Sequence, residues 1–290
     1  MKIINFGSLN IDHVYTVDHF VRPGETLASS NYQQFCGGKG LNQSIALAHA
    51  GATVMHAGKI GADGIKLKER LEQSGVDTSP VKVDDGPTGH AIIQVNGDGE
   101  NAIFLYGGAN QSIMPEDINE ALAKSQPGEY LLLQNEISAI PQIMEQAARR
   151  DLNIIFNPAP ANKAVQDYPL ELVRQFIVNE VEAAELSGEN DPERMLSQLR
   201  IRFPDASIVL TLGSNGVMYA DESQKLFTPA QKTSAVDTTA AGDTFIGYFL
   251  AERIRGTGIN QSLEIACKAA AICVSRPGAA DSIPQKHEVE

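Results

Sequence analysis

An aspartate at the start of a predicted helix is the residue best placed to do chemistry in this chain. Asp243 follows the loop-like run 237–242, and we expect a strand to end at that run and a long apolar helix to follow it. Small residues at Ala240, Ala241 and Gly242 allow close backbone approach, and the first N–H groups of a helix lack intrahelical partners, which predicts an anion site. A carboxylate beside that site suits removal of a proton from a hydroxyl that attacks phosphorus. The alternative is an ordinary capping acid favoured by the helix dipole.

A second motif, rich in glycine, lies nearer the N-terminus. Residues 37–43 read GGKGLNQ and precede a small-residue helix expected over 44–50. Backbone amides at a glycine-rich helix start suit an anionic or polyhydroxylated ligand. The spacing matches neither GxxxxGK[ST] nor GxGxxG. Taken alone, a glycine pair of this kind is more often a tight turn that leads into a helix.

In this order and at this separation, the two motifs resemble the two signatures of the ribokinase-like (PfkB) carbohydrate kinase family. Shorter matches to the family extend over essentially the whole chain, at residues 7–12 (GSLNID), 157–161 (NPAPA), 179–182 (NEVE) and 211–216 (TLGSNG). The resemblance implies ATP-dependent phosphorylation of the primary (5-) hydroxyl of D-ribose. Deoxyribose, another furanose, a hexose or a nucleoside remain alternative acceptors within the same family.

The resemblance also assigns roles in phosphoryl transfer, a reaction in which proteins mainly position groups and neutralise charge. Asp243 is implied as the base, and the backbone amides of Ala240, Ala241 and Gly242 as the group that holds phosphate charge. Asn179 and Glu182 match an Asn-x-x-Glu signature that is associated with Mg²⁺ and its waters. The implied nucleotide-binding residues are Asn179, Thr211, Gly213, Gly216 and Gly242.

A sugar requires several polar partners, because a site built around hydroxyls must hydrogen-bond each of them. The implied sugar-binding residues are Asn10, Asp12, Gly38, Lys39, Asn42, Glu136 and Asp243. Lys39 could instead be a solvated lysine. Asn10 and Asp12 follow the first strand, where the chain leaves the main sheet, so they can face a ligand held between the sheet and a lid.

Kinases of this family often hold potassium beside the anion site. Most of the ligands are backbone carbonyls, and the matching positions here are Asp237, Thr239, Cys273, Arg276, Gly278 and Ser282. The resemblance therefore implies ATP, Mg²⁺ and a monovalent activator, K⁺, as cofactors. The potassium ion would neutralise Asp237 and order the loop that leads to Gly242.

Apolar strand-like runs alternate with amphipathic helical segments along most of the chain. Strands are expected at 2–6, 53–57, 130–133, 153–156, 176–178 and 207–210, and helices at 64–74, 140–150 and 192–202. This alternation predicts an α/β fold in which helices cover both faces of a mainly parallel sheet and ligands bind at the carboxyl ends of its strands. We expect one ribokinase-like domain over residues 1–290.

Two stretches, about 12–35 and 87–107, have strand character without intervening helices. In the second, residues 91–95 and 101–105 flank the turn segment 96–99, which predicts a hairpin in a small separate sheet. The resemblance implies that this sheet is a lid over the sugar and a homodimer interface. Its apolar side chains need cover that a small sheet cannot provide. The alternative is a β insertion without a functional role.

Composition limits the possible partners. The 290-residue chain is 42% apolar and has a formal net charge of −13 and a pI near 4.9, so we expect it to bind neither nucleic acid nor anionic membranes. No apolar run reaches the ~20 residues that span a bilayer and no signal peptide is evident, which predicts a cytoplasmic protein. Three cysteines, Cys36, Cys267 and Cys273, indicate neither a disulfide framework nor a zinc site.

Two other classes of protein stay open as hypotheses. A sugar-binding regulator with a decayed kinase site is disfavoured because Asp243, Asn179 and Glu182 are all present. A nucleotide-dependent oxidoreductase is disfavoured because no GxGxxG follows the first strand. Ribose binding without ATP turnover would support the first class, and binding of a nicotinamide nucleotide would support the second.

Overall fold

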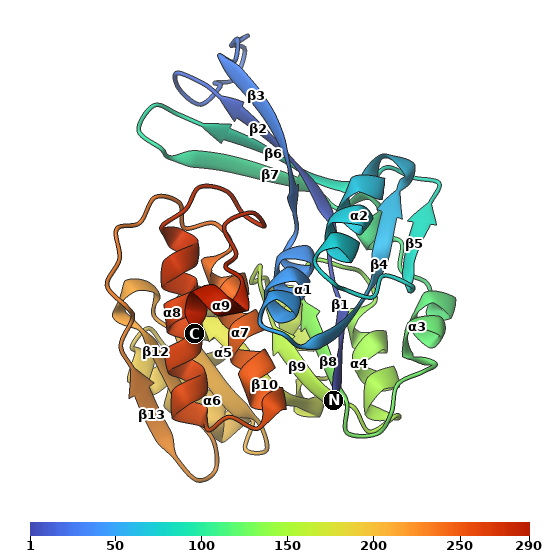
Figure 1. Ribbon diagram of the computed structural model, residues 1–290, viewed down its shortest axis with the longest axis vertical. Coiled ribbons are helices and arrows are strands. Elements are labelled where there is room, and N and C mark those ends of the chain that lie inside the picture. The colour runs from blue at the N-terminus through green and yellow to red at the C-terminus, as the bar shows by residue number, and fades with distance from the viewer.

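The computed structural model describes residues 1–290 and contains two separate β-sheets (Figure 1). The main-sheet strands are β1 (Lys2–Phe6), β4 (Thr53–Gly61), β5 (Val81–Asp84), β8 (Tyr130–Gln134), β9 (Asn153–Asn157), β10 (Val173–Asn179), β11 (Ser207–Thr211), β12 (Val217–Ala220) and β13 (Lys225–Thr228). Their order across the sheet is β13-β12-β11-β10-β9-β8-β1-β4-β5, and all neighbours are parallel except β11–β12 and β12–β13.

Helices cover both faces of the main sheet. One face carries α1 (Lys39–His49), α2 (Ile65–Gln73), α7 (Ala241–Arg255), α8 (Ile259–Val274) and α9 (Lys286–Val289). The other carries α3 (Pro115–Leu122), α4 (Ile140–Ala148), α5 (Glu180–Ser187) and α6 (Pro192–Arg202). Successive residues of a strand point to opposite faces, so Ile3 and Leu132 pack with the first group while Ile4 and Leu133 pack with the second. The predicted α/β fold class, with helices on both faces of a mainly parallel sheet, is confirmed. None of the helices combines the length and apolar character needed to cross a bilayer.

The strand order creates a switch point between β8 and β1. From β1 the chain builds β4 and β5 on one side, and it then crosses to add β8 to β11 on the other. Connections after β1 and β8 therefore leave in opposite directions, which opens a crevice at the carboxyl ends of these strands. This edge is where the predicted site residues after β1, β8 and β10 are found.

Two predictions about the C-terminal half were incomplete or wrong. The short antiparallel strands β12 and β13 were not predicted, because each has only four residues. No strand ends before Asp237, since residues 229–240 form an irregular, largely exposed connection. The sheet already ends at β13, and this segment must cross from the sheet edge to α7 on the covered face, so it runs over the surface.

The smaller sheet, which we call the lid, projects from one end of the body (Figure 1). It contains β2 (Asn10–Thr16), β3 (Asn31–Gly37), β6 (Gly89–Val95) and β7 (Asn101–Tyr106) in the order β3-β2-β6-β7. The hairpin of β6 and β7 is confirmed, and the lid strands span 10–37 and 89–106, close to the expected bounds. Three residues separate β1 from β2, so the lid continues directly from a buried interior strand of the main sheet.

Candidate active site

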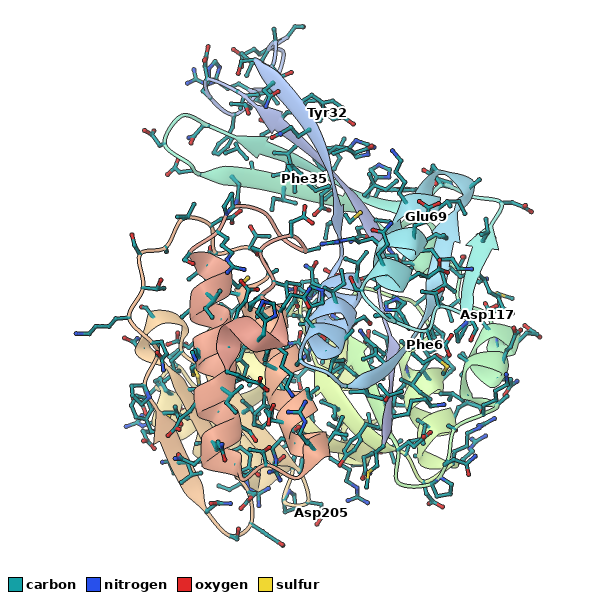
Figure 2. All side chains as sticks on the ribbon, viewed as in Figure 1. Phe6, Tyr32, Phe35, Glu69, Asp117 and Asp205 are labelled. Carbon is teal, nitrogen blue, oxygen red and sulfur yellow. The ribbon has the colours of Figure 1, made fainter.

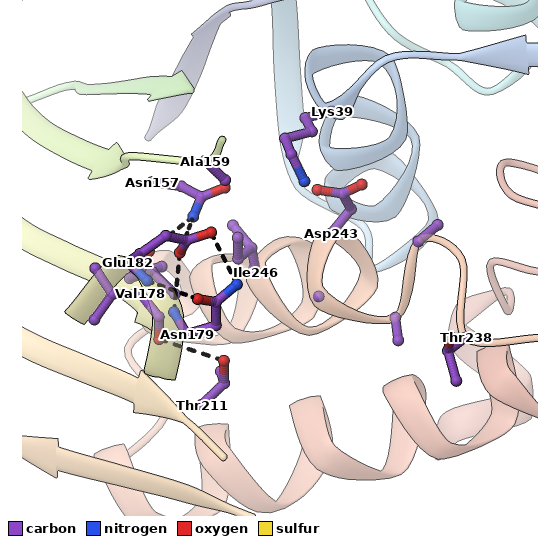
Figure 3. Close-up of a pocket in the computed structure, with 14 residues that line it drawn as sticks. Lys39, Asn157, Ala159, Val178, Asn179, Glu182, Thr211, Thr238, Asp243 and Ile246 are labelled. Carbon is purple, nitrogen blue, oxygen red and sulfur yellow. Dashed lines mark hydrogen bonds between the residues drawn. The ribbon is translucent and has the colours of Figure 1, made fainter. Parts of the chain in front are cut away.

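Helix α7 begins within the predicted anion-binding run. Ala240 is its N-cap and has a φ of 61°, a left-handed conformation that is uncommon for a residue with a Cβ and is often found at functional sites. A Cβ at Gly242 would meet nothing within 4 Å, so open space lies beside this residue in the first turn of α7. The first turn opens into a pocket lined by Lys39, Asn157, Ala159, Ile177, Val178, Asn179, Glu182, Thr211, Thr238, Ala240, Ala241, Gly242, Asp243 and Ile246 (Figure 3).

Close packing of α7 on α1 places Asp243 beside the glycine motif. A Cβ at Gly247 would lie 2.3 Å from the Cβ of Ala46, so only glycine allows the two helices to approach this closely. The buried Asp243 carboxylate then accepts hydrogen bonds from two α1 amides. Asn42 Nδ2 lies 3.1 Å from Oδ2, and Gln43 Nε2 lies 2.8 Å from Oδ1. Asp243 is therefore held by side-chain donors, which a simple capping acid does not require.

Lys39 lies in the pocket and does not extend into solvent. It is the first residue of α1, and its amino group is directed towards the Asp243 carboxylate in Figure 3. The negative charge of Asp243 raises the lysine pKa and outweighs the lowering effect of burial, with smaller contributions from Glu136 and Glu182. The turn before it requires Gly38, whose φ is 97° and whose Cβ would meet the Ser8 carbonyl oxygen at 2.9 Å. Lys39 is thus a permanent positive charge beside Asp243.

The Asn-x-x-Glu motif forms a capping box at the start of α5. Asn179 Nδ2 donates to Glu182 Oε1 at 2.9 Å, its backbone N–H donates to Oε2 at 2.9 Å, and the Glu182 N–H donates back to Asn179 Oδ1 at 2.9 Å. Burial raises the pKa of Glu182, with Asn179 and Lys39 acting in the opposite direction. The motif lines the pocket next to Thr211, whose hydroxyl donates to the Val178 carbonyl at 3.3 Å.

The predicted sugar-binding carboxylates meet on the other side of Lys39. Glu136 Oε2 accepts the Lys39 backbone N–H at 3.0 Å and the Ser8 hydroxyl. Asp12 lies over Gly37, and burial followed by repulsion from Glu136 raises its pKa to about 7. Burial also raises the pKa of Glu136. The negative charge of Glu136 is partly offset by Lys39, and Asp12 has no paired cation, so both carboxyls can accept hydrogen bonds from ligand hydroxyls.

Asn10 is oriented by a residue that sequence reasoning did not identify. The buried Asn110 accepts the Leu9 N–H at 3.1 Å and donates through Nδ2 to Asn10 Oδ1 at 2.8 Å. With its oxygen turned to Asn110, Asn10 has its Nδ2 donors directed away from Asn110 and available to a ligand. Asn10 therefore offers donors where Asp12 and Glu136 offer acceptors.

The remaining predicted residues divide into two groups. Gly213 and Gly216 follow β11 at the same sheet edge and do not line the pocket. The six proposed potassium positions are mostly gathered. Asp237 accepts the Thr239 N–H at 2.9 Å and the Gly278 N–H at 3.0 Å, and the Cys273 thiol lies 3.0 Å from Ser282 Oγ. The Arg276 side chain instead pairs with Glu288 at 2.6 Å, away from Asp237.

Fold and site together define a phosphotransferase of the α/β type, in which a carboxylate in the first turn of a helix lies beside a lysine at the switch point of a mainly parallel sheet. Comparison with known proteins gives the family. The sequence profile of the pfkB family of carbohydrate kinases matches residues 1–286, and the chain belongs to this family.

Named relatives resemble the chain over almost its full length. The ribokinase of Staphylococcus aureus is 36% identical over 303 residues, with 99% of this chain and 98% of the relative covered. The crystal structure of ribokinase from Cryptococcus neoformans in complex with ADP has a TM-score of 0.86 at 34% identity and covers 99% of this chain and 98% of that chain. Arabidopsis thaliana ribokinase complexed with ribose and ATP has a TM-score of 0.87 at 26% identity, covering 99% and 96%.

Proposed function

We propose that this chain transfers the γ-phosphoryl group of ATP to the primary 5-hydroxyl of D-ribose, giving ribose 5-phosphate and ADP. The observation that carries the proposal is the placement of Asp243. It lies buried in the first turn of α7, whose N-terminus can hold phosphate, and close enough to Glu136 to act on the charge of that carboxyl, which with Asn10 and Asp12 can hold a polyhydroxylated ring. The similarity to ribokinases, one of them complexed with ribose and ATP, supports ribose as the acceptor.

In this mechanism the chain's own groups position the reactants and neutralise charge. Asp243 takes the proton of the ribose 5-hydroxyl while the oxygen of that hydroxyl forms a bond to the γ-phosphorus of ATP. The bond between the γ-phosphorus and the oxygen of the departing ADP breaks in the same step. The amides at the N-terminus of α7, with that of Gly242 foremost because the Ala241 N–H already donates to the Thr238 carbonyl, hold charge on the transferred group, and Lys39 adds a positive charge beside it. Asn10, Asp12 and Glu136 orient the sugar so that only its primary hydroxyl reaches the base.

The oxygens of Asn179 and Glu182 fit a magnesium ion held through its waters. Glu182 is a buried carboxylate that lines the pocket, and its oxygens accept from three donors, Asn179 N, Asn179 Nδ2 and Asn157 Nδ2, which leaves one of about four acceptor sites. A hard cation that keeps most of its waters suits so few protein ligands. When bound there, Mg²⁺ would supply positive charge to the phosphates of ATP.

A potassium site next to α7 is the second part of the proposal. The Asp237 carboxylate accepts hydrogen bonds from Thr239, in the loop before α7, and from the Gly278 N–H in the C-terminal segment. No cationic side chain is paired with this carboxylate. A monovalent cation held by Asp237 and nearby carbonyls would order the connection to Gly242. Because the Arg276 side chain is engaged by Glu288, Arg276 could contribute only its carbonyl.

The lid supports a homodimer as the third part. Its apolar residues are about half exposed on β7, where Ile103, Phe104 and Leu105 have exposed fractions of 53%, 59% and 53%. Ile103 and Leu105 point to one face of the lid and Phe104 to the other, so a second copy of the same sheet would cover one of these two faces. Consumption of ATP favours a cytoplasmic location for the enzyme.

A coupled assay of ADP formation with D-ribose, 2-deoxyribose, fructose and adenosine as acceptors tests the proposal. We expect ribose to have the highest kcat/KM, with 2-deoxyribose poorer because one hydroxyl partner is missing. A higher value for a hexose or a nucleoside would keep the kinase and change its acceptor. Ribose binding without turnover in any arm would instead indicate a sugar-binding regulator.

A further inference from the structure

A chain of buried amide side chains reaches Asp243 from the interior of the main sheet. Gln43 lies fully buried on α1 and contacts Asp243 on one side and Gln134, the last residue of β8, on the other. Gln134 in turn contacts Asn5 of β1. None of these three amides was assigned a role from the sequence, and only Gln43 touches the proposed base.

The direction of each amide follows from two backbone carbonyls that can only accept. Asn5 Nδ2 lies 2.8 Å from the Gly40 carbonyl oxygen, so Asn5 must turn its oxygen to Gln134. Gln134 then donates through Nε2 to Asn5 Oδ1 at 2.9 Å and to Gln43 Oε1 at 2.7 Å. Because its oxygen is occupied, Gln43 must present its two N–H donors to the pocket side.

A second anchor leads to the same orientation from the other side. Asn157 Nδ2 lies 2.9 Å from the Ile177 carbonyl oxygen, so Asn157 must turn its Oδ1 towards Gln43. Gln43 Nε2 lies 3.2 Å from that Oδ1 and 2.8 Å from Asp243 Oδ1. The two hydrogens of one amide nitrogen are thus shared between Asp243 and Asn157, whose own Nδ2 is 3.4 Å from Glu182.

We propose that Gln43 is a positioning residue for the base, and that its amide is locked as a donor to Asp243 by Gln134 and Asn157. The inference rests on the proposed role of Asp243. The network holds Oδ1 while Asn42 holds Oδ2, so the carboxylate plane is fixed before the sugar arrives. A fixed plane keeps a free lone pair aimed at the substrate hydroxyl, which is the geometric requirement of general-base catalysis.

The test is a double-mutant cycle between Gln43 and Asp243. Gln43→Met keeps the side-chain length and removes both donors, and we expect kcat to fall about 10- to 100-fold, the effect of losing a hydrogen bond to a charged group. The KM values for ribose and ATP should stay within about threefold. In the Asp243→Asn background the same change should lower kcat less than about threefold, because the carboxylate that Gln43 positions is gone.

Ser44→Ala provides the matched control. Ser44 is the next residue of α1, is equally buried, and contacts His56 and Asn5, whose amide stays oriented by the Gly40 carbonyl when the Ser44 hydroxyl is removed. Its replacement should lower the melting temperature and leave kcat within about twofold. If Gln43→Met does not fold, Gln134→Met removes the donor that orients Gln43 and should lower kcat with the same dependence on Asp243.

Two results would overturn the inference. One is a kcat within twofold of the parent for the Gln43→Met enzyme, and the other is an equal loss of kcat in both Asp243 backgrounds, which marks a purely structural role. Nearly full activity of the Asp243→Asn enzyme would instead show that Asp243 is not the general base. Failure of the proposed mechanism can thus be distinguished from failure of this inference.

Discussion

The main sheet and the lid differ in how far their apolar side chains are buried. Central main-sheet residues such as Ile3, Ile4 and Leu132 are completely buried because helices cover both faces. On the lid, Phe104 and Tyr106 are more than half exposed, and Figure 2 shows Tyr32 and Phe35 on the projecting strands far from Phe6 in the body. A sheet is stable only when a second layer covers an apolar face, so the body provides a rigid frame and the lid needs a ligand or a partner.

The site is divided along the same line. Asp243, Lys39 and Glu182 belong to helices of the body, and the buried amides that reach Asp243 come from its central strands. Asp12 belongs to the lid. Burial, followed by repulsion from Glu136, raises the pKa of its carboxyl. In the proposed mechanism, the groups for phosphoryl transfer therefore belong to the preformed body, and sugar recognition is shared between Glu136 of the body and Asn10 and Asp12 of the lid.

The largest effect should come from the body. Asp243→Asn keeps the size of the side chain and removes its basicity, so we expect kcat to fall by roughly 10²–10⁴-fold with ribose and ATP binding largely preserved. Steady-state kinetics and calorimetric titration measure the two effects separately. Asp205→Asn, an exposed acid at the opposite end of the body, is the control. Activity within a few-fold of the parent enzyme would exclude Asp243 as the base.

A change in the lid should affect recognition and leave chemistry alone. In Asp12→Ala the ribose hydroxyls lose a carboxylate acceptor, and we expect the KM for ribose to rise about 10- to 100-fold, as loss of hydrogen bonds to a charged group implies. The KM for ATP should change less than about threefold. Kinetics with each substrate varied at a saturating level of the other will decide this, and an unchanged KM for ribose would refute the sugar pocket.

The exposed lid surface should matter for assembly. Phe104→Asp places a charge in the proposed dimer interface, so we expect the dimer dissociation constant to rise at least about tenfold, since loss of a buried apolar anchor typically costs ~2 kcal/mol or more. Analytical ultracentrifugation measures it. Phe227→Asp on β13 is a matched control, because Phe227 is 57% exposed and belongs to the main sheet. A parent protein that stays monomeric at micromolar concentrations would count against the interface.

A smaller effect is expected from monovalent cations. If potassium orders the loop around Asp237, kcat should be several-fold higher in potassium than in sodium, and Asp237→Asn should remove most of that difference because the ion loses its only charged ligand. Initial rates at constant ionic strength provide the comparison. Equal rates in potassium, sodium and tetramethylammonium would argue against the site.

The smallest effect is on stability. The pKa of the Asp12 carboxyl is about 7 in the folded chain and 3.8 in a model peptide, so the folded state binds the proton more tightly than the unfolded state does. Ionisation of Asp12 therefore lowers the free energy of unfolding as pH rises, at a cost to stability. This cost is absent below pH 3.8, grows up to pH 7 and is constant above it. We expect Asp12→Asn to raise the melting temperature of the ligand-free protein by roughly 2–4 °C or more at pH 8 and hardly at pH 4. Equal shifts at both pH values would contradict the assigned pKa.

Patterns of residue type were enough to predict the main architecture. Runs such as Leu131-Leu132-Leu133 alternate with amphipathic helices, and local hydrophobic periodicity is visible without knowledge of the fold. The hairpin of β6 and β7 was predicted for the same reason, because its turn residues lie between two short strands. The antiparallel edge strands were missed, since four-residue strands carry too little pattern, and the strand expected before Asp237 does not exist.

By itself the sequence determined which chemical groups are present and near which strand ends they lie, because motifs and periodicity are local properties. Only the tertiary structure decided which groups meet. Gln43 and Asp243 are 200 positions apart, and their hydrogen bond exists because Gly247 lets α7 pack closely on α1. The direction of that bond depends on the carbonyls of Gly40 and Ile177, and a hydrogen-bond network between distant strands has no signature in the order of residues.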